Sequence, residues 1–201
     1  MKKIIAATNN KGKLKEFREL LKDYPVEVLS LHDMGLDMDI EETGETFEDN
    51  AKIKSVAVFK ATGLCAVGDD SGLCVEALDG MPGVYSARFA GEKATDEDRN
   101  NLLLKKMEDV KKQDRDAKFV CAISCTMEDG ETFVVRGECK GEITFESKGD
   151  SGFGYDPLFY VEQYDKTFGE MTSFEKNEIS HRAEAMCKFK KEFEKHLEVK
   201  K

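Results

Sequence analysis

The feature that most constrains the fold is a pair of alternating segments on either side of Asp129-Gly130. The odd positions of residues 119–127 are all apolar or sulfur-containing, and in residues 133–142 apolar side chains alternate with charged ones. A period of two is typical of strands, and Asp-Gly between two such segments predicts a tight hairpin. The two segments therefore predict neighbouring antiparallel strands, which excludes a purely parallel sheet.

The rest of the chain alternates short apolar segments with segments in which apolar residues recur at helical spacing. Strands are expected at residues 3–7, 26–30, 64–68, 73–78 and 158–161. Helices are expected after Lys13, from Phe47 to Gly63, from Thr95 to Met107 and after the N-cap candidate Ser180. Together with the hairpin, this order predicts one α/β domain with a mixed sheet and flanking helices.

The composition is that of a folded, acidic protein. The chain has 201 residues, of which 40% are hydrophobic and only 3 are proline, so a single ordered domain is expected. The net charge of −10 disfavours nonspecific binding to nucleic acid or to an anionic membrane surface, so we expect neither as a partner. A polyanionic ligand would need a local group of basic side chains or a metal ion.

Membrane segments and disulfides are not expected either. Lys2 and Lys3 precede only the short apolar stretch Ile4–Ala7, which is too short for a signal peptide, and no later stretch could span a membrane. The 6 cysteines form no C-x-x-C pair, and most lie in apolar segments. We therefore expect reduced, buried thiols in a cytoplasmic protein, with disulfides as the alternative.

The segment Ala66–Leu73 contains the first candidate site. Asp69 and Asp70 follow a short apolar strand, and a serine and a glycine come next. Because side chains alternate along a strand, the two carboxylates should have different roles, and Asp70, nearer the expected turn, is the better candidate to face a cleft. Carboxylates of this kind bind Mg²⁺, commonly together with substrate phosphates. The alternative is a solvated acidic turn.

Two polar loops could supply the rest of a phosphate site. Thr8–Lys13 connects a strand to a helix, and the free N–H groups and positive dipole end of a helix N-terminus bind anions. Its spacing does not match a Walker A loop, and a solvated turn with a capping threonine would look similar. Glu41 and Glu42 lie in a second loop, which matters for function only if it meets Asp70.

Two features nearer the C-terminus could recognise a flat ligand. Phe153 lies between two glycines in Gly152–Pro157, so little neighbouring bulk would prevent its ring from lying against a base. A packed ring in a tight turn is the alternative. His181 and Arg182 follow Ser180 in a first helical turn, where positive charge opposes the helix dipole. This local cost suggests that they meet an anionic or acceptor-rich ligand.

Six motifs together carry a resemblance to a known family. They are Thr8-Asn-Asn-Lys-Gly-Lys13, Glu41-Glu-Thr-Gly-Glu-Thr-Phe-Glu-Asp-Asn-Ala51, Asp69-Asp-Ser-Gly-Leu73, Gly80-Met-Pro-Gly-Val-Tyr-Ser-Ala-Arg-Phe-Ala-Gly91, Gly152-Phe-Gly-Tyr-Asp-Pro157 and Lys176-Asn-Glu-Ile-Ser-His-Arg182. In these motifs and their order the chain resembles the inosine triphosphate pyrophosphatases, or XTP/dITP diphosphatases, of the bacterial type. The resemblance implies one elongated mixed α/β domain over residues 1–201, with two lobes around a central substrate cleft, and usually a homodimer.

The resemblance also implies an activity and its residues. The activity is Mg²⁺-dependent hydrolysis of ITP, dITP and XTP to the monophosphate and pyrophosphate, which removes damaged nucleotides from the precursor pool. By position, Asp70 corresponds to the catalytic carboxylate and a metal ligand, and Glu41 to its metal-binding partner. The implied phosphate and sugar contacts are Thr8, Asn9, Asn10, Lys11, Gly12, Lys13, Lys54, Ser71 and Lys176, and the implied base contacts are Phe153, Gly154, Tyr155, Asp156, His181 and Arg182.

This activity fits the chemistry of the residues. Water must attack the α-phosphorus while pyrophosphate leaves, so the site needs positive charge and a positioned water more than a covalent nucleophile. Mg²⁺ and lysines would supply the charge, and Asp70 would orient or deprotonate the water. Donors from Arg182 and nearby N–H groups would pair with O6 of a 6-keto purine but would meet the 6-amino group of adenine donor to donor.

Three other functions compete with this one. A related pyrophosphatase for modified pyrimidine or methylated purine triphosphates is disfavoured by the Ser180-His-Arg and Gly152-Phe-Gly-Tyr-Asp segments. A haloacid dehalogenase phosphatase would need Asp-x-Asp, and Asp69-Asp70 lacks that spacing. A silent nucleotide-binding module would have no need for the acidic pair and Glu41. Asp69 is expected to be structural, orienting the turn or a lysine.

Overall fold

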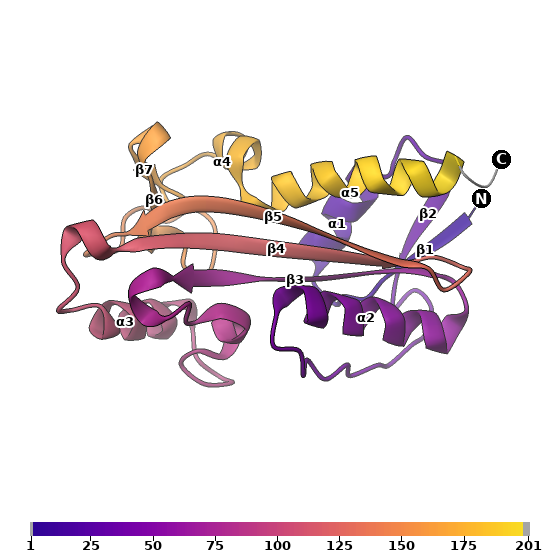
Figure 1. The fold of residues 1–201 in the computed structure, drawn as a ribbon, viewed down its shortest axis with the longest axis horizontal. Helices are drawn as coiled ribbons and strands as arrows, with labels where there is room; N and C mark the ends of the chain where they lie inside the picture. Colours follow the sequence, from indigo (N-terminus) through magenta and orange to yellow (C-terminus); the bar gives the residue numbers. More distant parts are fainter. Residues whose placement is uncertain (1, 199–201) are drawn as a thin grey trace. The chain divides into compact units, whose positions relative to one another are not determined.

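The structure is a computed structural model that describes residues 2–198 (Figure 1). Its order of helices and strands agrees with the predicted α/β class. The elements are β1 Lys2–Ala6, α1 Lys11–Leu20, β2 Val26–Ser30, α2 Phe47–Thr62, β3 Cys65–Val75, α3 Asp96–Lys106, β4 Asp116–Thr126, β5 Thr132–Ile143, β6 Phe159–Val161, β7 Lys166–Thr167, α4 Ser173–Ile179 and α5 His181–Glu198.

The strands form one mixed sheet in the order β2-β1-β3-β4-β5-β6-β7. β1 pairs in parallel with β2 and β3, with Ile4 opposite Val28 on one side and Cys65 on the other. β6 pairs antiparallel with both β5 and β7. The β4–β5 hairpin turns through Gly130, whose φ of 85° favours glycine. The prediction of a mixed sheet with flanking helices is confirmed.

The chain divides into two compact units. Unit 1 contains the residues up to Asp70, residues 121–137 and the residues from Ala185 onward, and unit 2 contains residues 71–120 and 138–184. The chain passes from one unit to the other within β3, β4, β5 and α5. Each unit has its own hydrophobic core.

In unit 1 both faces of the sheet are buried. Ile4 packs in a cluster with Phe17 of α1 and Phe189 of α5, whose ring centroids are 6.2 Å apart. Its neighbour Ile5 packs in a second cluster with Val58 of α2. Figure 1 shows α1 and α5 on one side of the strands of unit 1 and α2 on the other. Because successive side chains of a strand alternate, adjacent residues supply two separate cores.

Unit 2 has an aromatic core. The rings of Phe119, Phe159 and Phe168 lie with their centroids 4.7 to 5.7 Å apart. Leu103 of α3 and Met107, just after the end of this helix, are fully buried in the same cluster. The odd-position face of β4 therefore enters both cores, since Phe119 belongs to unit 2 and the following odd positions belong to unit 1.

The structure departs from prediction around the acidic segment. β3 is continuous from Cys65 to Val75, so Asp69 and Asp70 lie inside a strand and not at a turn. β1 pairs with β3 over Cys65–Val67, before the acidic pair, and β4 is the other neighbour of β3 in the sheet. The place of β3 in the sheet therefore outweighs the turn preference of Asp, Ser and Gly. The extended stretch predicted up to Leu78 is wrong at its end, where residues 76–78 form a 3₁₀ turn. Helix α4 and strand β7 were not predicted.

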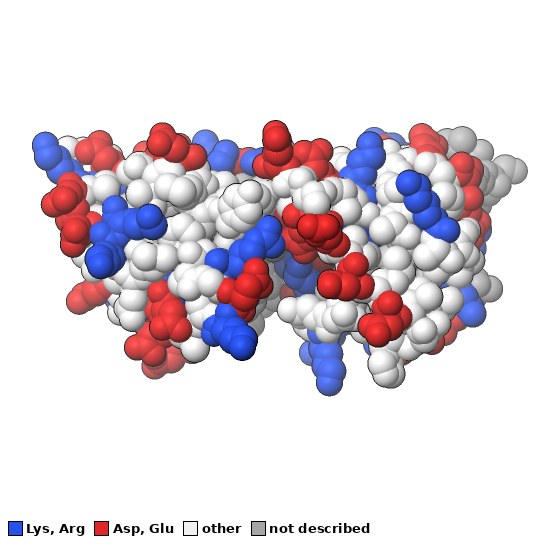
Figure 2. All heavy atoms as spheres, turned by 90° about the horizontal axis from the view of Figure 1, so that it is seen from below, with Lys and Arg blue, Asp and Glu red and all other residues white. Residues whose placement is uncertain are grey.

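One face of the molecule carries side chains of both charges. Acidic and basic side chains are interspersed on the face shown in Figure 2, which offers no continuous basic stripe of the kind that follows a nucleic-acid backbone. Among the described residues, every helix is too short or too polar to cross a membrane.

Candidate active site

A glycine in β3 lets α2 approach the part of the strand that carries Asp69 and Asp70. A Cβ added at Gly68 would lie 2.5 Å from the carbonyl oxygen of Ala51 and 2.7 Å from the Cβ of Lys54. No side chain larger than hydrogen fits between strand and helix at this point. The close approach places Lys54 beside the two aspartates.

Lys54 joins the charged groups of this site. Its Nζ lies 2.8 Å from Glu42 Oε1, 2.9 Å from the carbonyl oxygen of Asp69 and 3.6 Å from Asp70 Oδ1. The Lys54 and Asp70 side chains are each 11% exposed. One ammonium group thus contacts two carboxylates and a carbonyl oxygen. Because these groups are largely buried, removing the ammonium would leave carboxylate charge without a partner and destabilise the fold.

Asp70 is held on its other oxygen by an amide. Asn50 Nδ2 donates to Asp70 Oδ2 at 3.1 Å, and Asn50 Oδ1 accepts the Gly44 N–H at 2.8 Å. Burial raises the pKa of Asp70 above its ordinary value, and Glu42 adds to the rise, although Lys54 and the Asn50 hydrogen bond oppose it. A buried carboxyl group with a raised pKa beside a lysine is typical of a functional site.

Asp69 has a different partner from Asp70. Its Oδ2 lies 2.7 Å from Lys13 Nζ, and its side chain is 1% exposed. The lysine comes from the start of α1, where Asn10 Oδ1 accepts the N–H groups of Gly12 and Lys13 at 2.8 and 3.2 Å. Asp69 therefore ties the strand to the loop expected to bind phosphate.

The loop Thr8–Lys13 is partly helical. α1 begins at Lys11, and its N-cap is Asn10, whereas the sequence had suggested a threonine as the alternative cap. Asn9, Asn10, Lys11 and Gly12 are exposed. Their polar groups are accessible to a ligand, so the predicted phosphate contacts are sterically possible.

The acidic loop before α2 brings Glu42, not Glu41, to Lys54. Glu41 is exposed, and its role as a metal ligand stays a prediction. Neither glutamate lies in a helix or strand, so no period fixes which of two consecutive side chains turns toward α2. Sequence reasoning therefore could not choose between them.

The oxygen ligands of this site suit a hard divalent cation. Among residues 2–198, no three His, Cys, Asp or Glu side chains are close enough to hold a metal ion by themselves. Mg²⁺ does not need such a group, because it is commonly bound by one or two carboxylates together with water and substrate phosphates. Asp70 and Glu42 offer such a donor set around the Lys54 ammonium, so the residues present fit Mg²⁺.

Unit 2 carries the loop Gly152–Pro157, which exposes a single aromatic ring. Phe153 is 77% exposed, whereas Tyr155 and Asp156 are 3% and 2% exposed. The Tyr155 hydroxyl donates to the carbonyl oxygen of Ser86 at 2.8 Å, and Asp156 Oδ2 accepts the Phe153 N–H at 2.9 Å. The predicted base-binding motif thus consists of an exposed ring and buried residues that support it; their contact with a base stays a prediction.

Lys176, expected near phosphate or sugar, lies beside this loop. Its Nζ is 2.5 Å from Asp156 Oδ2 and 5.0 Å from the ring centroids of both Phe153 and Phe168. An ammonium group near the face of an aromatic ring is an attractive cation–π arrangement. The lysine therefore steadies both the carboxylate inside the loop and the exposed ring.

The segment at the junction of α4 and α5 agrees with its predicted local structure. Ser180 Oγ accepts the Ala183 N–H at 3.2 Å, so Ser180 is the N-cap of α5. The His181 ring stacks on Phe119 with centroids 4.9 Å apart, and Arg182 is half-buried. Ser71, the first residue of unit 2, directly follows Asp70 in β3 and is also half-buried.

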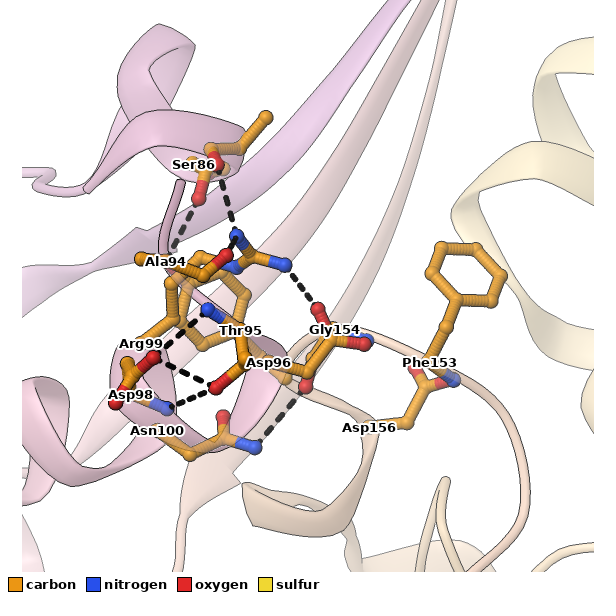
Figure 3. A network of polar contacts seen from close by, with 12 residues as sticks. Ser86, Ala94, Thr95, Asp96, Asp98, Arg99, Asn100, Phe153, Gly154 and Asp156 are labelled. Atoms are coloured by element: carbon orange, nitrogen blue, oxygen red, sulfur yellow. Dashed lines mark hydrogen bonds and ion pairs between the residues drawn. The ribbon is translucent and has the colours of Figure 1, made fainter. Parts of the chain in front are cut away.

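Sequence reasoning gave no site role to four residues that support these sites, although it had named Glu42 as part of a loop that would matter if it met Asp70. Glu42 and Asn50 belong to the Asp70 cluster, and Asp96 and Asn100 bind the backbone of Gly154 in unit 2 (Figure 3). Asn50 and Asn100 could have been suspected, since asparagine has a low helix propensity and both lie in predicted helices.

Comparison with known proteins agrees with the fold and with the resemblance found in the sequence. The model of the Ham1 family matches residues 4–192. A dITP/XTP pyrophosphatase of Bacillus licheniformis is 50% identical over 188 residues, which cover 94% of this chain and 96% of the relative. The Ham1 protein of Staphylococcus aureus superposes with a TM-score of 0.92 at 44% identity, over 97% of this chain and 100% of that one.

A third relative extends the comparison to another group of bacteria. A structure described as a nucleoside-triphosphatase, dITP/XTP pyrophosphatase, from Mycobacterium abscessus has a TM-score of 0.82 at 42% identity, over 93% of this chain and 97% of that one. The fold thus defines the same class of mixed α/β protein as these structures. This chain belongs to the Ham1 family. The resemblance stated from the six motifs is confirmed.

Proposed function

We propose that this protein is a nucleoside triphosphate pyrophosphatase that converts dITP, ITP and XTP to the monophosphate and pyrophosphate, and so removes damaged nucleotides from the precursor pool. The observation that carries the proposal is the nearly buried Asp70, held by Lys54 and Asn50, in a chain 50% identical to a dITP/XTP pyrophosphatase. A carboxylate held in place by two partners is a suitable group to position a water molecule.

The triphosphate would be bound by cationic and N–H groups of unit 1. Lys13 is 26% exposed at its side chain even while paired with Asp69, and the exposed residues of the Thr8–Lys13 loop lie at the N-terminus of α1. Helix N-termini and lysines both favour phosphate. They would let a protein with a net charge of −10 bind a polyanion.

Mg²⁺ is the cofactor we propose. Asp70 would hold it, with Glu42 or the predicted Glu41 as the second carboxylate. When bound, the ion would neutralise phosphate charge as bonding to the α-phosphorus changes. The proposal is supported by the carboxylate oxygens gathered at Lys54.

The reaction itself needs one positioned water. Asp70 would orient this water and accept its proton while the oxygen bonds to the α-phosphorus. The bond from the α-phosphorus to the bridging oxygen breaks, and pyrophosphate leaves with that oxygen. Lys13 and Lys54 would stabilise the charge that collects on the phosphate oxygens.

Base selection would come from unit 2. The exposed Phe153 ring can stack on a purine, and donors from Arg182 and neighbouring N–H groups would pair with O6. Adenine would present its own donor at this position and leave buried groups unpaired, which is what makes such selection strong.

Two further proposals concern the protein in the cell. We propose a cytoplasmic enzyme, supported by four buried cysteines that form no disulfide, Cys65, Cys121, Cys125 and Cys139. We also propose a homodimer, supported by large apolar side chains exposed in unit 2, such as Tyr85 and Phe145 at 57% and 61%.

The test is a pyrophosphate-release assay with Mg²⁺ on ITP, XTP, GTP, ATP and dTTP. We expect ITP and XTP to be preferred, with one pyrophosphate released for each monophosphate formed. Equal rates on all five substrates would refute the proposed base selection. Release of orthophosphate would refute attack at the α-phosphorus.

The metal has a test that does not depend on turnover. Mg²⁺ that binds only the folded protein raises its melting temperature. We expect this shift in the wild type and a much smaller one in Asp70→Asn. Equal shifts in both proteins would remove Asp70 from the metal site.

A further inference from the structure

The backbone of unit 2 is held on both sides of Phe153, although the ring itself is exposed. The Phe153 N–H donates to Asp156 Oδ2 at 2.9 Å, and the Gly154 N–H donates to Asp96 Oδ2 at 2.7 Å. These N–H groups belong to the peptide planes before and after the Cα of Phe153. Holding both planes sets the direction in which its side chain leaves the backbone.

The second of these contacts is part of a double clamp on Gly154. Asp96 is the first residue of α3, and Asn100 lies one turn further on. Asn100 Nδ2 donates to the carbonyl oxygen of Gly154 at 3.0 Å, so both backbone groups of this glycine bind α3. Figure 3 shows the two side chains of α3 reaching the loop while the Phe153 ring points away from them.

Arg99 orients the carboxylate of this clamp. Its guanidinium pairs with Asp96 Oδ1 and donates to the carbonyl oxygens of Ala94 and Ala87 at 2.7 and 3.0 Å. Asp96 Oδ2 is thereby left for the Gly154 N–H. Burial alone would raise the pKa of Asp96, but this N–H and Arg99 together place it below its ordinary value. The bond to Gly154 is therefore charge-assisted at neutral pH.

Asparagine at position 100 makes the folded state less stable than an apolar residue of the same size would. The residue is 6% exposed, and within the described part of the chain its buried Oδ1 has no hydrogen-bond partner. A buried acceptor without a partner destabilises the folded state, and leucine would fill nearly the same volume without that cost. What leucine could not do is donate to the Gly154 carbonyl.

The glycines on either side of Phe153 match this arrangement. Gly152 and Gly154 have φ of 81° and 62°, in the left-handed region. A Cβ at Gly152 would lie 2.0 Å from Asp156 Oδ2, so the carboxylate can reach the Phe153 N–H only because no side chain is there.

We propose that Asp96 and Asn100 are positioning residues that hold Gly154 and thereby present the Phe153 ring in a fixed place to the purine base of the substrate. The inference rests on the proposed function and adds residues to it that none of the motifs had assigned to the base. A base that stacks on a ring already in place loses less conformational entropy on binding. The clamp therefore acts on base affinity and not on the chemical step.

The experiment compares Asp96→Ala with a matched control, Asp98→Ala. Asp98 is in the same first turn of α3, but its carboxylate accepts the Thr95 N–H at 2.9 Å and belongs to the helix cap. For XTP we expect Asp96→Ala to raise KM about tenfold with kcat nearly unchanged, a typical loss for one stacked base. Asp98→Ala should leave both constants near the wild-type values.

A substrate without a base separates positioning from general damage. Ribose 5-triphosphate has the sugar and phosphates of the substrate, so its KM should be the same in Asp96→Ala and in the wild type. In a double-mutant cycle, Asp96→Ala should add little to Phe153→Ala, because the clamp acts through that ring. Asn100→Leu should also raise KM for XTP, although its melting temperature should equal or exceed that of the wild type.

Three results would overturn the inference. These are an equal rise of KM for XTP and ribose 5-triphosphate, additive effects of Asp96→Ala and Phe153→Ala, or a normal KM for XTP in a stably folded Asn100→Leu. A wild-type protein that does not convert XTP to XMP and pyrophosphate would instead refute the proposed function, so the two failures can be told apart.

Discussion

In unit 1 the aspartate and the lysine at the centre of the candidate phosphate and metal site are nearly buried, whereas in unit 2 the aromatic side chain expected to meet the base is largely exposed. Asp70 and Lys54 have side chains only 11% exposed, while Phe153 is 77% exposed. The first site is held by ion pairs and hydrogen bonds to the functional groups themselves. The second is held through the backbone on either side of the ring.

This difference has consequences for variants of the two sites. A change in the Asp70 cluster alters the charge balance of nearly buried groups, so it should change both stability and activity, in the same or in opposite directions. A change at the Phe153 ring removes exposed surface, so it should affect ligand binding while leaving stability within about 0.5 kcal/mol. Measuring both stability and substrate binding in variants of each site therefore tests this difference between the two units.

The largest effect is expected from Asp70→Asn. If Asp70 accepts the proton of water as proposed, its loss should lower kcat about 10²–10⁴-fold. Because burial raises the pKa of Asp70, its carboxyl group stabilises the fold below its unfolded pKa and loses this contribution as pH rises through the folded pKa. The neutral amide should therefore raise the melting temperature at pH 7, by roughly 2–4 °C for each kcal/mol gained. Activity assays and calorimetry measure the two effects.

Asp69→Asn is the matched control, because it makes the same chemical change one residue away. Asp69 is paired with Lys13 at 2.7 Å, so its loss should destabilise the fold by about 1–3 kcal/mol. The two neighbouring variants should thus shift the melting temperature in opposite directions. Shifts of the same sign would contradict the distinct roles given to the two aspartates.

Lys54→Met should be the most destabilising change of this series. It removes the cation shared by Glu42, Asp70 and the Asp69 carbonyl, and breaking such a buried pair costs about 3–5 kcal/mol. If Asp70 and Glu42 can hold Mg²⁺, the ion should restore part of the lost melting temperature, and more than it adds to the wild type. An unfolding series with and without Mg²⁺ decides this, and an equal gain in both proteins would argue against a shared site.

Phe153→Ala should affect only the substrate. Stacking of a base on an aromatic ring contributes about 1–3 kcal/mol, so KM for XTP should rise about tenfold while the melting temperature stays unchanged. Phe174→Ala is the control, since Phe174 is 74% exposed in the same unit and lies in α4. If both variants raise KM equally, the Phe153 ring has no special role.

Regular elements with a clear period could be predicted from the sequence. The alternation on either side of Asp129-Gly130 predicted the β4–β5 hairpin, and capping residues predicted the starts of α2 and α3 at Phe47 and Asp96. These signals are local, since they depend on residues within a few positions of each other. The candidate site was located by the same kind of local pattern, together with the order of the six motifs.

Contacts between distant residues could not be predicted. Asp69-Asp70-Ser71-Gly72 has a local preference for a turn, but it lies inside the continuous strand β3, which has β4 as a neighbour in the sheet. Gly154 is bound by Asp96 and Asn100, which precede it by more than fifty positions. In both places the deciding partner comes from another element, and the sequence has no period that identifies it.

The smallest effect is expected at Glu175, which lies in the first turn of α4 and directly precedes Lys176. Lys166 lies 2.7 Å from Glu175 Oε1, and Oε2 accepts the Thr172 N–H at 2.8 Å. Lys166 first, and then Thr172, lower the pKa of Glu175 to about 2. A lowered carboxyl pKa stabilises the fold above the unfolded value of 4.5, and this contribution is lost as pH falls toward 2.

Glu175→Gln should therefore reduce the melting temperature slightly at pH 7, and its difference from the wild type should shrink as pH falls below 4.5. Glu178→Gln is the control, because it removes the same charge from the same helix but leaves the Thr172 cap intact. Because Lys176 follows Glu175 directly, a loosened α4 should also raise KM for XTP by less than Phe153→Ala does. If the difference in melting temperature between Glu175→Gln and the wild type stays constant from pH 7 to pH 3, the charge of the Glu175 carboxylate does not stabilise the start of α4.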